Sequence, residues 1–177
     1  MEKFQAFPKM PRLTREIVIT EKIDGTNAQV CIGEDGSIRA GSRTRWITPE
    51  DDNFGFARWV DANRDELLLL GPGRHFGEWW GSGIQRTYGL SERRFSLFNV
   101  SRWSEERPAC CHVVPLLYRG VFDTAAVENV LDVLRLDGSQ ASPGFMNPEG
   151  VIVFHVAGNL GFKKTLEKDE QPKGQPQ

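Results

Sequence analysis

Residues 16–27 read EIVITEKIDGTN, and both the fold and the chemistry that the sequence predicts start from this stretch. Three β-branched apolar residues at 17–19 stand between charged residues, a composition typical of a β-strand. The dipeptide Asp24-Gly25 follows and is a common turn signal. Lys22 therefore ends an apolar strand and precedes a tight turn. On this stretch alone, a surface lysine at a hairpin turn is the simpler interpretation.

Short strand-like runs separated by turn residues continue along the chain, at residues 27–33, 37–43, 74–80, 94–100, 112–118, 150–156 and 159–165. Two stretches have the apolar spacing of helices instead. One covers residues 53–70 and ends at Gly71, and the other starts near Asp123 or Thr124 and continues to Leu134. Strands outnumber helices without regular strand–helix alternation, so we expect an antiparallel α+β domain rather than a doubly wound parallel sheet.

Composition restricts the class of protein. The chain has 177 residues, with 22 Lys and Arg against 24 Asp and Glu, so its formal net charge is −2. This balance excludes a protein whose nucleic-acid binding rests on overall basicity. No apolar run approaches the roughly 18 residues of a membrane span. The three cysteines, two of them adjacent, suit neither a disulfide framework nor a zinc site, and we expect a reduced, cytoplasmic protein.

The end of the chain differs in composition from the rest. Residues 167–177 read EKDEQPKGQPQ, a polar segment rich in Pro and Gln that predicts a disordered tail. No repeat or linker interrupts the preceding residues. The sequence therefore predicts one folded domain over residues 1–166.

Three further segments place charged residues in strand-like surroundings. FGEWWG sets Glu78 among glycines and tryptophans, EGVIV opens a strand with Glu149, and GFKKT carries Lys163 and Lys164 near its end. Each has a plain structural explanation by itself: an alternating strand, a turn or a solvated strand edge. Together with KIDGTN, and in this order, they are far more specific.

The series KIDGTN, FGEWWG, EGVIV and FKK resembles motifs I, III, IV and V of the lysine-adenylating nucleotidyltransferases. These include RNA ligases, ATP-dependent DNA ligases and mRNA capping guanylyltransferases. The Glu-Lys opening and the Thr-Asn after Asp-Gly are most similar to the nick-sealing RNA ligases. The resemblance covers residues 17–166. It implies an antiparallel-sheet nucleotidyltransferase domain, that is, an ATP-grasp-like ligase adenylation domain of the α+β class.

The resemblance also implies a function. We expect an ATP-dependent RNA ligase that joins 3′-hydroxyl and 5′-phosphate ends through a covalent lysyl-AMP intermediate, with ATP and Mg²⁺ (or Mn²⁺) as cofactors. Its nucleic-acid partner would be RNA or a nicked duplex. The alternatives are a capping-type guanylyltransferase, a minimal DNA ligase, or a non-catalytic nucleic-acid-binding relative. The presence of Lys22, Glu78 and Glu149 argues against the last, because a binding module does not need all three.

The family's residue roles carry over onto the matching positions of the first half of the chain. Lys22 would attack the α-phosphorus of ATP, and Asp24 would orient the lysine and the phosphate. The backbone of Glu21 resembles the position that reads the adenine edge. Asn27 would contact metal-bound water, and Glu78 would bind a ribose hydroxyl.

The remaining roles involve an aromatic ring, a metal ligand and two phosphate contacts. Phe98 resembles the ring that stacks on adenine, although a core position is equally plausible for it and Phe95 is an alternative stacking residue. Glu149 would arrange the divalent metal. Lys163 matches the first phosphate-binding lysine of motif V, and Arg43 stands where the family has a phosphate-contacting arginine.

Two features depart from the family pattern. Motif V normally reads Lys-x-Lys, whereas here Lys163 and Lys164 are adjacent and Thr165 takes the second lysine position. On a regular strand Lys164 would face away from Lys163, so either a bulge brings it to the nucleotide or one phosphate contact is missing. We count Lys164 among the candidate nucleotide-binding residues. The chain also stops soon after motif V, from which we expect no C-terminal accessory domain.

One further stretch mixes arginines with aromatic residues, a combination that suits binding to a nucleic-acid strand. Its five arginines are Arg86, Arg93, Arg94, Arg102 and Arg107. Acidic residues dilute the charge of the stretch, so a solvated face is the better interpretation for most of them.

Overall fold

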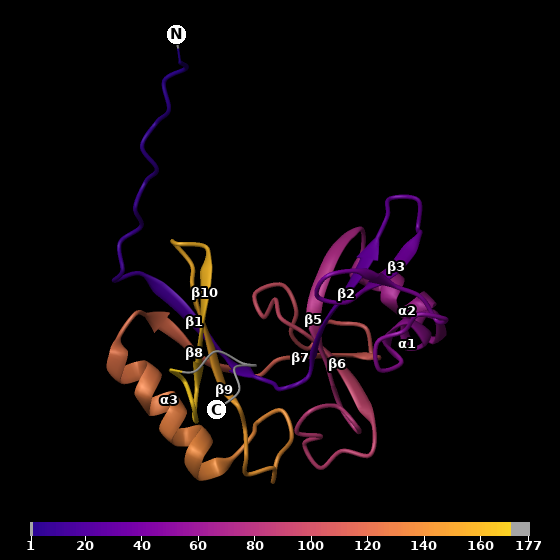
Figure 1. Cartoon of the computed structure of the whole chain (residues 1–177). Coiled ribbons are helices and arrows are strands. Elements are labelled where there is room, and N and C mark those ends of the chain that lie inside the picture. The colour runs from indigo at the N-terminus through magenta and orange to yellow at the C-terminus, as the bar shows by residue number, and fades with distance from the viewer. Residues whose placement is uncertain (1, 171–177) are drawn as a thin grey trace.

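A computed structural model describes residues 2–170 and shows two lobes, each built on one β-sheet (Figure 1). Residues 2–15 form an extended arm that leads away from the first lobe. Of the tail predicted at 167–177, residues 171–177 lie outside the described residues. Within the described part, the Thr165 backbone N–H donates to Asp169 Oδ1 at 2.8 Å, so a turn follows the last strand.

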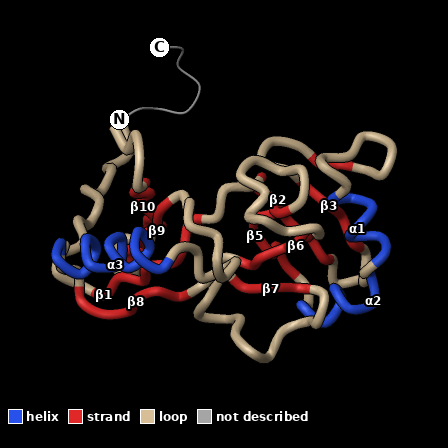
Figure 2. The backbone as a smooth tube through the Cα atoms, turned by 90° about the horizontal axis from the view of Figure 1, so that it is seen from below, coloured by secondary structure: helices blue, strands red, loops and turns tan. Residues whose placement is uncertain are grey.

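The first lobe has a four-stranded antiparallel sheet in the order β10-β9-β1-β8. The strands are β1 (Glu16–Lys22), β8 (Leu116–Val121), β9 (Gly150–His155) and β10 (Leu160–Thr165). Helix α3 (Thr124–Asp137) covers one face, as Figures 1 and 2 show. Of the two predicted starts, Asp123 is the cap, because its side chain accepts from the Ala125 N–H. Strand alternation buries Ile17 and Ile19 against this helix and turns Val18 and Thr20 toward the other lobe.

The second lobe has a six-stranded sheet in the order β4-β3-β2-β5-β6-β7, and only the β6–β7 pair is parallel. Its strands are β2 (Thr26–Ile32), β3 (Ile38–Gly41), β4 (Trp46–Ile47), β5 (Gly73–Gly81), β6 (Arg93–Leu97) and β7 (Cys111–Val113). Short helices pack on its outer face (Figure 1). This arrangement confirms the predicted antiparallel α+β class.

The helix predicted over residues 53–70 is broken into three pieces, α1 (Phe56–Ala62), α2 (Arg64–Leu67) and the 3₁₀ turn η1 (Leu68–Leu70). Gly55, at φ 75°, lies outside the right-handed helical region and delays the start. Asn63 breaks the middle, because its side-chain amide donates to the Trp59 carbonyl at 2.8 Å and its backbone leaves helical angles. None of the helices within residues 2–170 is long and apolar enough to cross a membrane.

The two lobes are joined where β1 leads into β2 and where β7 leads into β8. A small buried cluster of Ile23, Trp80, Tyr88 and Val114 lies at this junction. Gly25 is required here, because a Cβ at this position would lie 2.5 Å from the Trp79 carbonyl oxygen and 2.7 Å from the Trp80 Cβ. The glycine of the Asp-Gly pair therefore lets the chain after Lys22 lie directly against β5.

Candidate functional site

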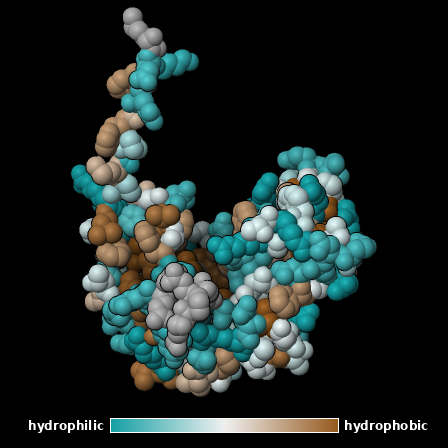
Figure 3. All heavy atoms as spheres, in the orientation of Figure 1, coloured by the Kyte–Doolittle hydropathy of each residue, from teal (hydrophilic) through white to brown (hydrophobic). Residues whose placement is uncertain are grey.

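A cleft of about 860 Å³ lies between the two sheets, and Figure 3 shows it as a hollow between the lobes. Its walls come from the end of β1, the start of β2, β5, the segment after β6, and strands β9 and β10. Lys22, Asp24, Asn27, Arg43, Glu78, Phe98 and Lys163 all line it, together with part of Glu21. Segments far apart in the sequence therefore meet at one site.

Lys22 and Glu149 are in direct contact across the edge of the cleft. The Lys22 Nζ lies 2.5 Å from Glu149 Oε2, and the two side chains are 18% and 2% exposed. Sheet register explains this contact, because Lys22 on β1 pairs with Gly150 on β9, and Glu149 immediately precedes that glycine. The buried carboxylate thus has a cation beside it, as a buried charge requires.

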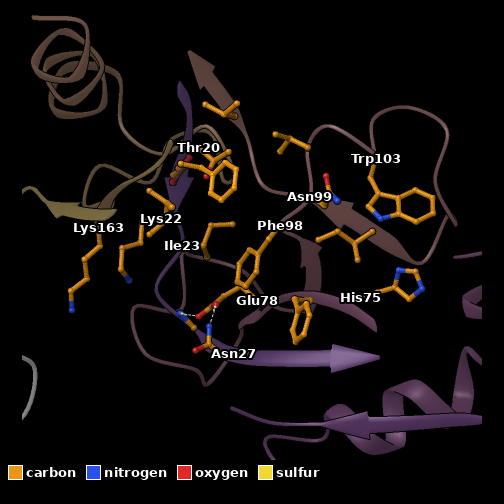
Figure 4. Close-up of a pocket in the computed structure, with 18 of the residues that line it drawn as sticks. Thr20, Lys22, Ile23, Asn27, His75, Glu78, Phe98, Asn99, Trp103 and Lys163 are labelled. Carbon is orange, nitrogen blue, oxygen red and sulfur yellow. Dashed lines mark hydrogen bonds between the residues drawn. The ribbon is translucent and has the colours of Figure 1, made fainter. Parts of the chain in front are cut away.

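Lys163 reaches the same region from β10. It pairs with Ile152, which in turn pairs with Thr20 on β1, so these three side chains share the face of the sheet that lines the cleft. Figure 4 shows the Lys22 and Lys163 side chains next to each other and extending in the same direction. Two lysine amines therefore converge on one part of the cleft.

The structure corrects the prediction that Lys164 binds the nucleotide. Strand β10 pairs residue for residue with β9 from Leu160 to Thr165, with no bulge. Lys164 therefore faces α3, where its Nζ lies 3.6 Å from Glu128 Oε1 and 3.6 Å from Asp169 Oδ2. Thr165, at the second lysine position, donates its hydroxyl to the Glu167 carbonyl. Of the lysine pair, the cleft receives Lys163.

Glu78 lies opposite Asn27 in the β2–β5 register, and its carboxylate accepts two hydrogen bonds. One comes from the Gly25 backbone N–H at 3.0 Å and the other from Asn27 Nδ2 at 3.1 Å (Figure 4). Burial raises the pKa of Glu78 to about 7, although the positive charge of Lys22 and the two hydrogen bonds act in the opposite direction. With this pKa, the Glu78 carboxyl changes between its neutral and charged forms near neutral pH.

The two candidate stacking residues occupy different environments. Phe98 is 40% exposed and projects into the cleft (Figure 4), with Ile152 also lining it. Phe95 is fully buried and packs against Phe56, with ring centroids 5.1 Å apart. Of these two residues, only Phe98 therefore offers the cleft a surface that a planar base could contact.

Asp24 is held by residues that the sequence analysis did not assign to the site. Its Oδ2 accepts from Arg86 Nε at 3.1 Å, and its backbone N–H donates to the Tyr88 hydroxyl at 2.8 Å. Arg86 also donates through Nη1 to the carbonyl and Oδ1 of Asn147, both at 2.9 Å, and to the Pro148 carbonyl at 3.2 Å. Arg86 thus ties the turn after Lys22 to the segment that precedes Glu149.

The loop that carries Arg86 has a strained backbone. Gln85, Thr87 and Tyr88 have φ values of 44°, 58° and 52°, a region that residues other than glycine rarely adopt. The Tyr88 ring packs between Trp80 and Phe145, with centroids 5.0 and 4.6 Å away. This tertiary packing stabilises the strained backbone. Because it involves residues distant in the sequence, no local sequence signal could have shown that this loop belongs to the site.

The Glu21 side chain points away from the cleft. It is 1% exposed and accepts from the Ser139 hydroxyl and from the backbone N–H groups of Gln140 and Ala141. Burial raises the pKa of this carboxyl, while these hydrogen bonds lower it. The predicted role of the Glu21 backbone remains a prediction. Arg43 is exposed and lies on the wall of the cleft.

The Glu149 carboxylate could bind a divalent cation whose other ligands are phosphate oxygens and water. Residues 2–170 contain no group of three or more His, Cys, Asp or Glu side chains that could hold a metal by itself. Mg²⁺ commonly binds through one or two carboxylates, with phosphate oxygens and water completing its shell. Glu149, a buried carboxylate beside Lys22, fits such a site as the protein ligand.

Comparison with known proteins identifies the family. The model of the RNA ligase family matches residues 15–166. The chain belongs to the RNA ligase family. The resemblance seen in the sequence motifs is thereby confirmed. A comparison with curated proteins gives no match.

Solved RNA ligases share the fold of this family member. A Naegleria gruberi RNA ligase mutant with ATP and Mn is 21% identical, with a TM-score of 0.64, and the match covers 86% of this chain and 50% of that chain. The Naegleria gruberi RNA ligase with PPi is 20% identical, with the same TM-score and the same coverage. The chain therefore spans about half the length of these solved relatives.

The raised pKa of Glu78 predicts a pH dependence of stability. Between about pH 4.5 and 7 the folded carboxyl binds more protons than the unfolded one, so stability falls as pH rises through this window. Glu78→Gln removes that loss, and the Asn27 amide can turn to keep its hydrogen bond. Relative to wild type, the variant should gain about 2 kcal/mol in unfolding free energy between pH 5 and pH 8, measured by urea unfolding.

A matched control for this prediction is Glu92→Gln, because the Glu92 side chain is 60% exposed. The control should follow the wild-type pH dependence. Parallel curves for wild type and Glu78→Gln would show that the Glu78 carboxyl does not titrate in this range.

Proposed function

We propose that this chain is the nucleotidyltransferase part of an ATP-dependent RNA ligase that forms a covalent lysyl-AMP on Lys22. The observation that carries the proposal is that Lys22, in contact with the buried Glu149, lines one cleft together with Lys163, and that the other wall of this cleft holds Glu78 and Phe98. The RNA ligase family match and the fold shared with RNA ligases support it.

The first chemical step is nucleophilic attack by Lys22 on the α-phosphorus of ATP. A nitrogen–phosphorus bond forms while the bond to the pyrophosphate oxygen breaks, and the nitrogen gives up a proton. Glu149 Oε2 is an acceptor within hydrogen-bond distance of that nitrogen. The contact between them also fixes where the amine lies, so the nucleophile is positioned before the nucleotide arrives.

The other cleft residues bind and orient the nucleotide. Phe98 stacks on the base, and Glu78 accepts a hydrogen bond from a ribose hydroxyl. Lys163 and Arg43 lie where they can stabilise the negative charge that builds up on the phosphate oxygens. Glu149 would hold Mg²⁺ or Mn²⁺ together with the phosphates, and the metal would supply Lewis-acid stabilisation of that charge.

Two later steps complete the proposed reaction. The AMP moves from Lys22 to a 5′-phosphate, and a 3′-hydroxyl then displaces AMP to join the ends. RNA is the proposed polynucleotide, and the cytoplasm is the proposed location. A capping-type guanylyltransferase is the second candidate because its first step is the same. The choice of ATP or GTP as the labelling nucleotide separates the two.

The test of this function is transfer of label from α-labelled ATP to denatured protein in the presence of Mg²⁺. Wild type should be labelled, and label should be absent from Lys22→Gln, which retains an amide donor for Glu149. Glu128→Gln, far from Lys22 on α3, serves as the control and should label normally. Preferential labelling by GTP would assign capping chemistry, and a labelled Lys22→Gln would contradict the assigned nucleophile.

The adjacent residues Lys163 and Lys164 provide a matched pair of variants that tests the proposed phosphate contact. Lys163→Ala should lower the rate of self-labelling about 100-fold, because it removes a cation from the cleft. Lys164→Ala should lower it less than threefold, because Lys164 pairs with Glu128 and Asp169 on the other face. Labelling time courses for the two variants measure this difference. Equal losses in the two variants would contradict the orientation of β10 in the structure, in which Lys163 faces the cleft and Lys164 faces away from it.

Arg86 should act on the rate of labelling rather than on ATP binding, because it does not line the cleft and contacts Asp24 and the segment before Glu149. Arg86→Ala should lower the maximal rate about 30-fold with a KM for ATP within threefold of wild type. Added guanidinium should restore part of the rate. A loss confined to KM, or an equal loss in the exposed control Arg135→Ala, would contradict a positioning role.

A further inference from the structure

We propose that one open face of the second sheet binds an unpaired RNA strand and leads its end into the cleft. The inference rests on the proposed function and adds the surface that receives the substrate. We call this surface the arginine–aromatic strip, and it consists of Arg39, Trp46, Arg74 and Phe76.

Strand register places the strip on a single face. Cys31 on β2 pairs with Arg39 on β3 and with Arg74 on β5. Two positions earlier on β2, Gln29 pairs with Gly41 and Phe76, and Gly41 pairs with Trp46 on β4. Cross-strand partners share a face of a sheet, so the four side chains of the strip are on the same side. Helices α1 and α2 cover the other face.

The strip has the charge that a phosphate backbone requires. Within β2, β3, β4 and β5, Glu78 is the only acidic residue, and it is 7% exposed inside the cleft. Arg39 and Arg74 are both exposed, and Arg43 follows β3 along the same wall of the cleft. A chain with a net charge of −2 thus concentrates positive charge on this face.

The aromatic residues of the strip offer surfaces for bases. Trp46 is 36% exposed and Phe76 is 51% exposed. The guanidinium carbon of Arg39 lies 4.2 Å from the Trp46 ring centroid, and that of Arg74 lies 5.6 Å from it, so these side chains are already ordered in a stack. Exposed rings beside arginines bind unpaired bases by stacking, which bases inside a duplex do not permit.

The strip is continuous with the candidate site. Arg74 and Phe76 line the same cleft as Lys22 and Phe98. A strand that lies along the strip therefore enters the cleft at its wall. Of the arginines between positions 86 and 107, Arg93 donates to the Phe54 carbonyl, and Arg102, which also lines this cleft, donates to the Leu70 carbonyl.

The first test measures binding of a fluorescent oligouridine across a salt series. Arg39→Gln should weaken binding about fivefold and reduce the slope of log affinity against log salt by about 0.7, the value for one phosphate contact on a single strand. Trp46→Ala should weaken binding about tenfold and leave the slope unchanged. The control Arg64→Gln, on α2 over the opposite face, should match wild type. Tighter binding of a duplex, or equal binding by all four proteins, would overturn the inference.

The second test uses the native thiol in the middle of the strip. Cys31 lies between Arg39 and Arg74 and is partly exposed, whereas the partly exposed Cys110 lies in the segment before β7. Saturating oligouridine should slow alkylation of Cys31 at least fivefold and leave Cys110 unchanged, as measured by mass spectrometry. Unchanged alkylation of Cys31 would overturn the inference. Labelling of wild type by ATP, measured in parallel, tests the proposed function separately, so the two can fail independently.

Discussion

The contact between Lys22 and Glu149 is the constraint on which the rest of the site depends. These residues are 127 positions apart in the chain, and the antiparallel pairing of β1 with β9 brings them together. A carboxylate that is 2% exposed needs a cation beside it, because an unpaired buried charge costs several kcal/mol. The first sheet therefore fixes both the position of the nucleophile and its charge partner. Lys163 joins them because β10 extends the same sheet.

The second lobe is aligned with this contact by backbone and side chains at the junction. The chain leaves Lys22 through Gly25, which lies so close to β5 that a larger residue would collide with Trp79. Arg86 and Tyr88 then hold Asp24 from the side of the second lobe. Glu78 and Asn27 consequently face the lysines across the cleft. The strained backbone around Arg86 is consistent with a loop that is retained for this alignment rather than for local stability.

Sequence reasoning identified those parts of the site that depend on residue type and order along the chain. Lys22, Glu78, Glu149 and Lys163 could be found because each stands in a short pattern on or next to a strand. Strand alternation left two orientations open for Lys164, of which the structure shows the one that faces away from the cleft. The fold class followed from the spacing of strand-like runs. Phe98 and Phe95 could not be separated, because both lie in one apolar run and only tertiary packing shows which ring is buried.

Other features depend on contacts between distant segments and could not be derived from local patterns. Arg86 belongs to the site because it reaches Asn147 and Pro148, which are about 60 positions away. The strip arises from the register of β2, β3, β4 and β5, which turns scattered arginines and aromatics toward one face. The break at Asn63 reflects a side-chain bond to Trp59 that competes with helix geometry.

The most direct test of the central claim is to locate the nucleotide on the chain itself. After incubation with ATP and Mg²⁺, the protein would be digested under mildly alkaline conditions, which preserve a phosphoramide bond, and its peptides analysed by mass spectrometry. We expect an adenylate on the peptide that contains Lys22, attached to the Lys22 side chain and to no other lysine. An adenylate on Lys163 or on another residue, or an unmodified Lys22 in protein that has released pyrophosphate, would contradict it.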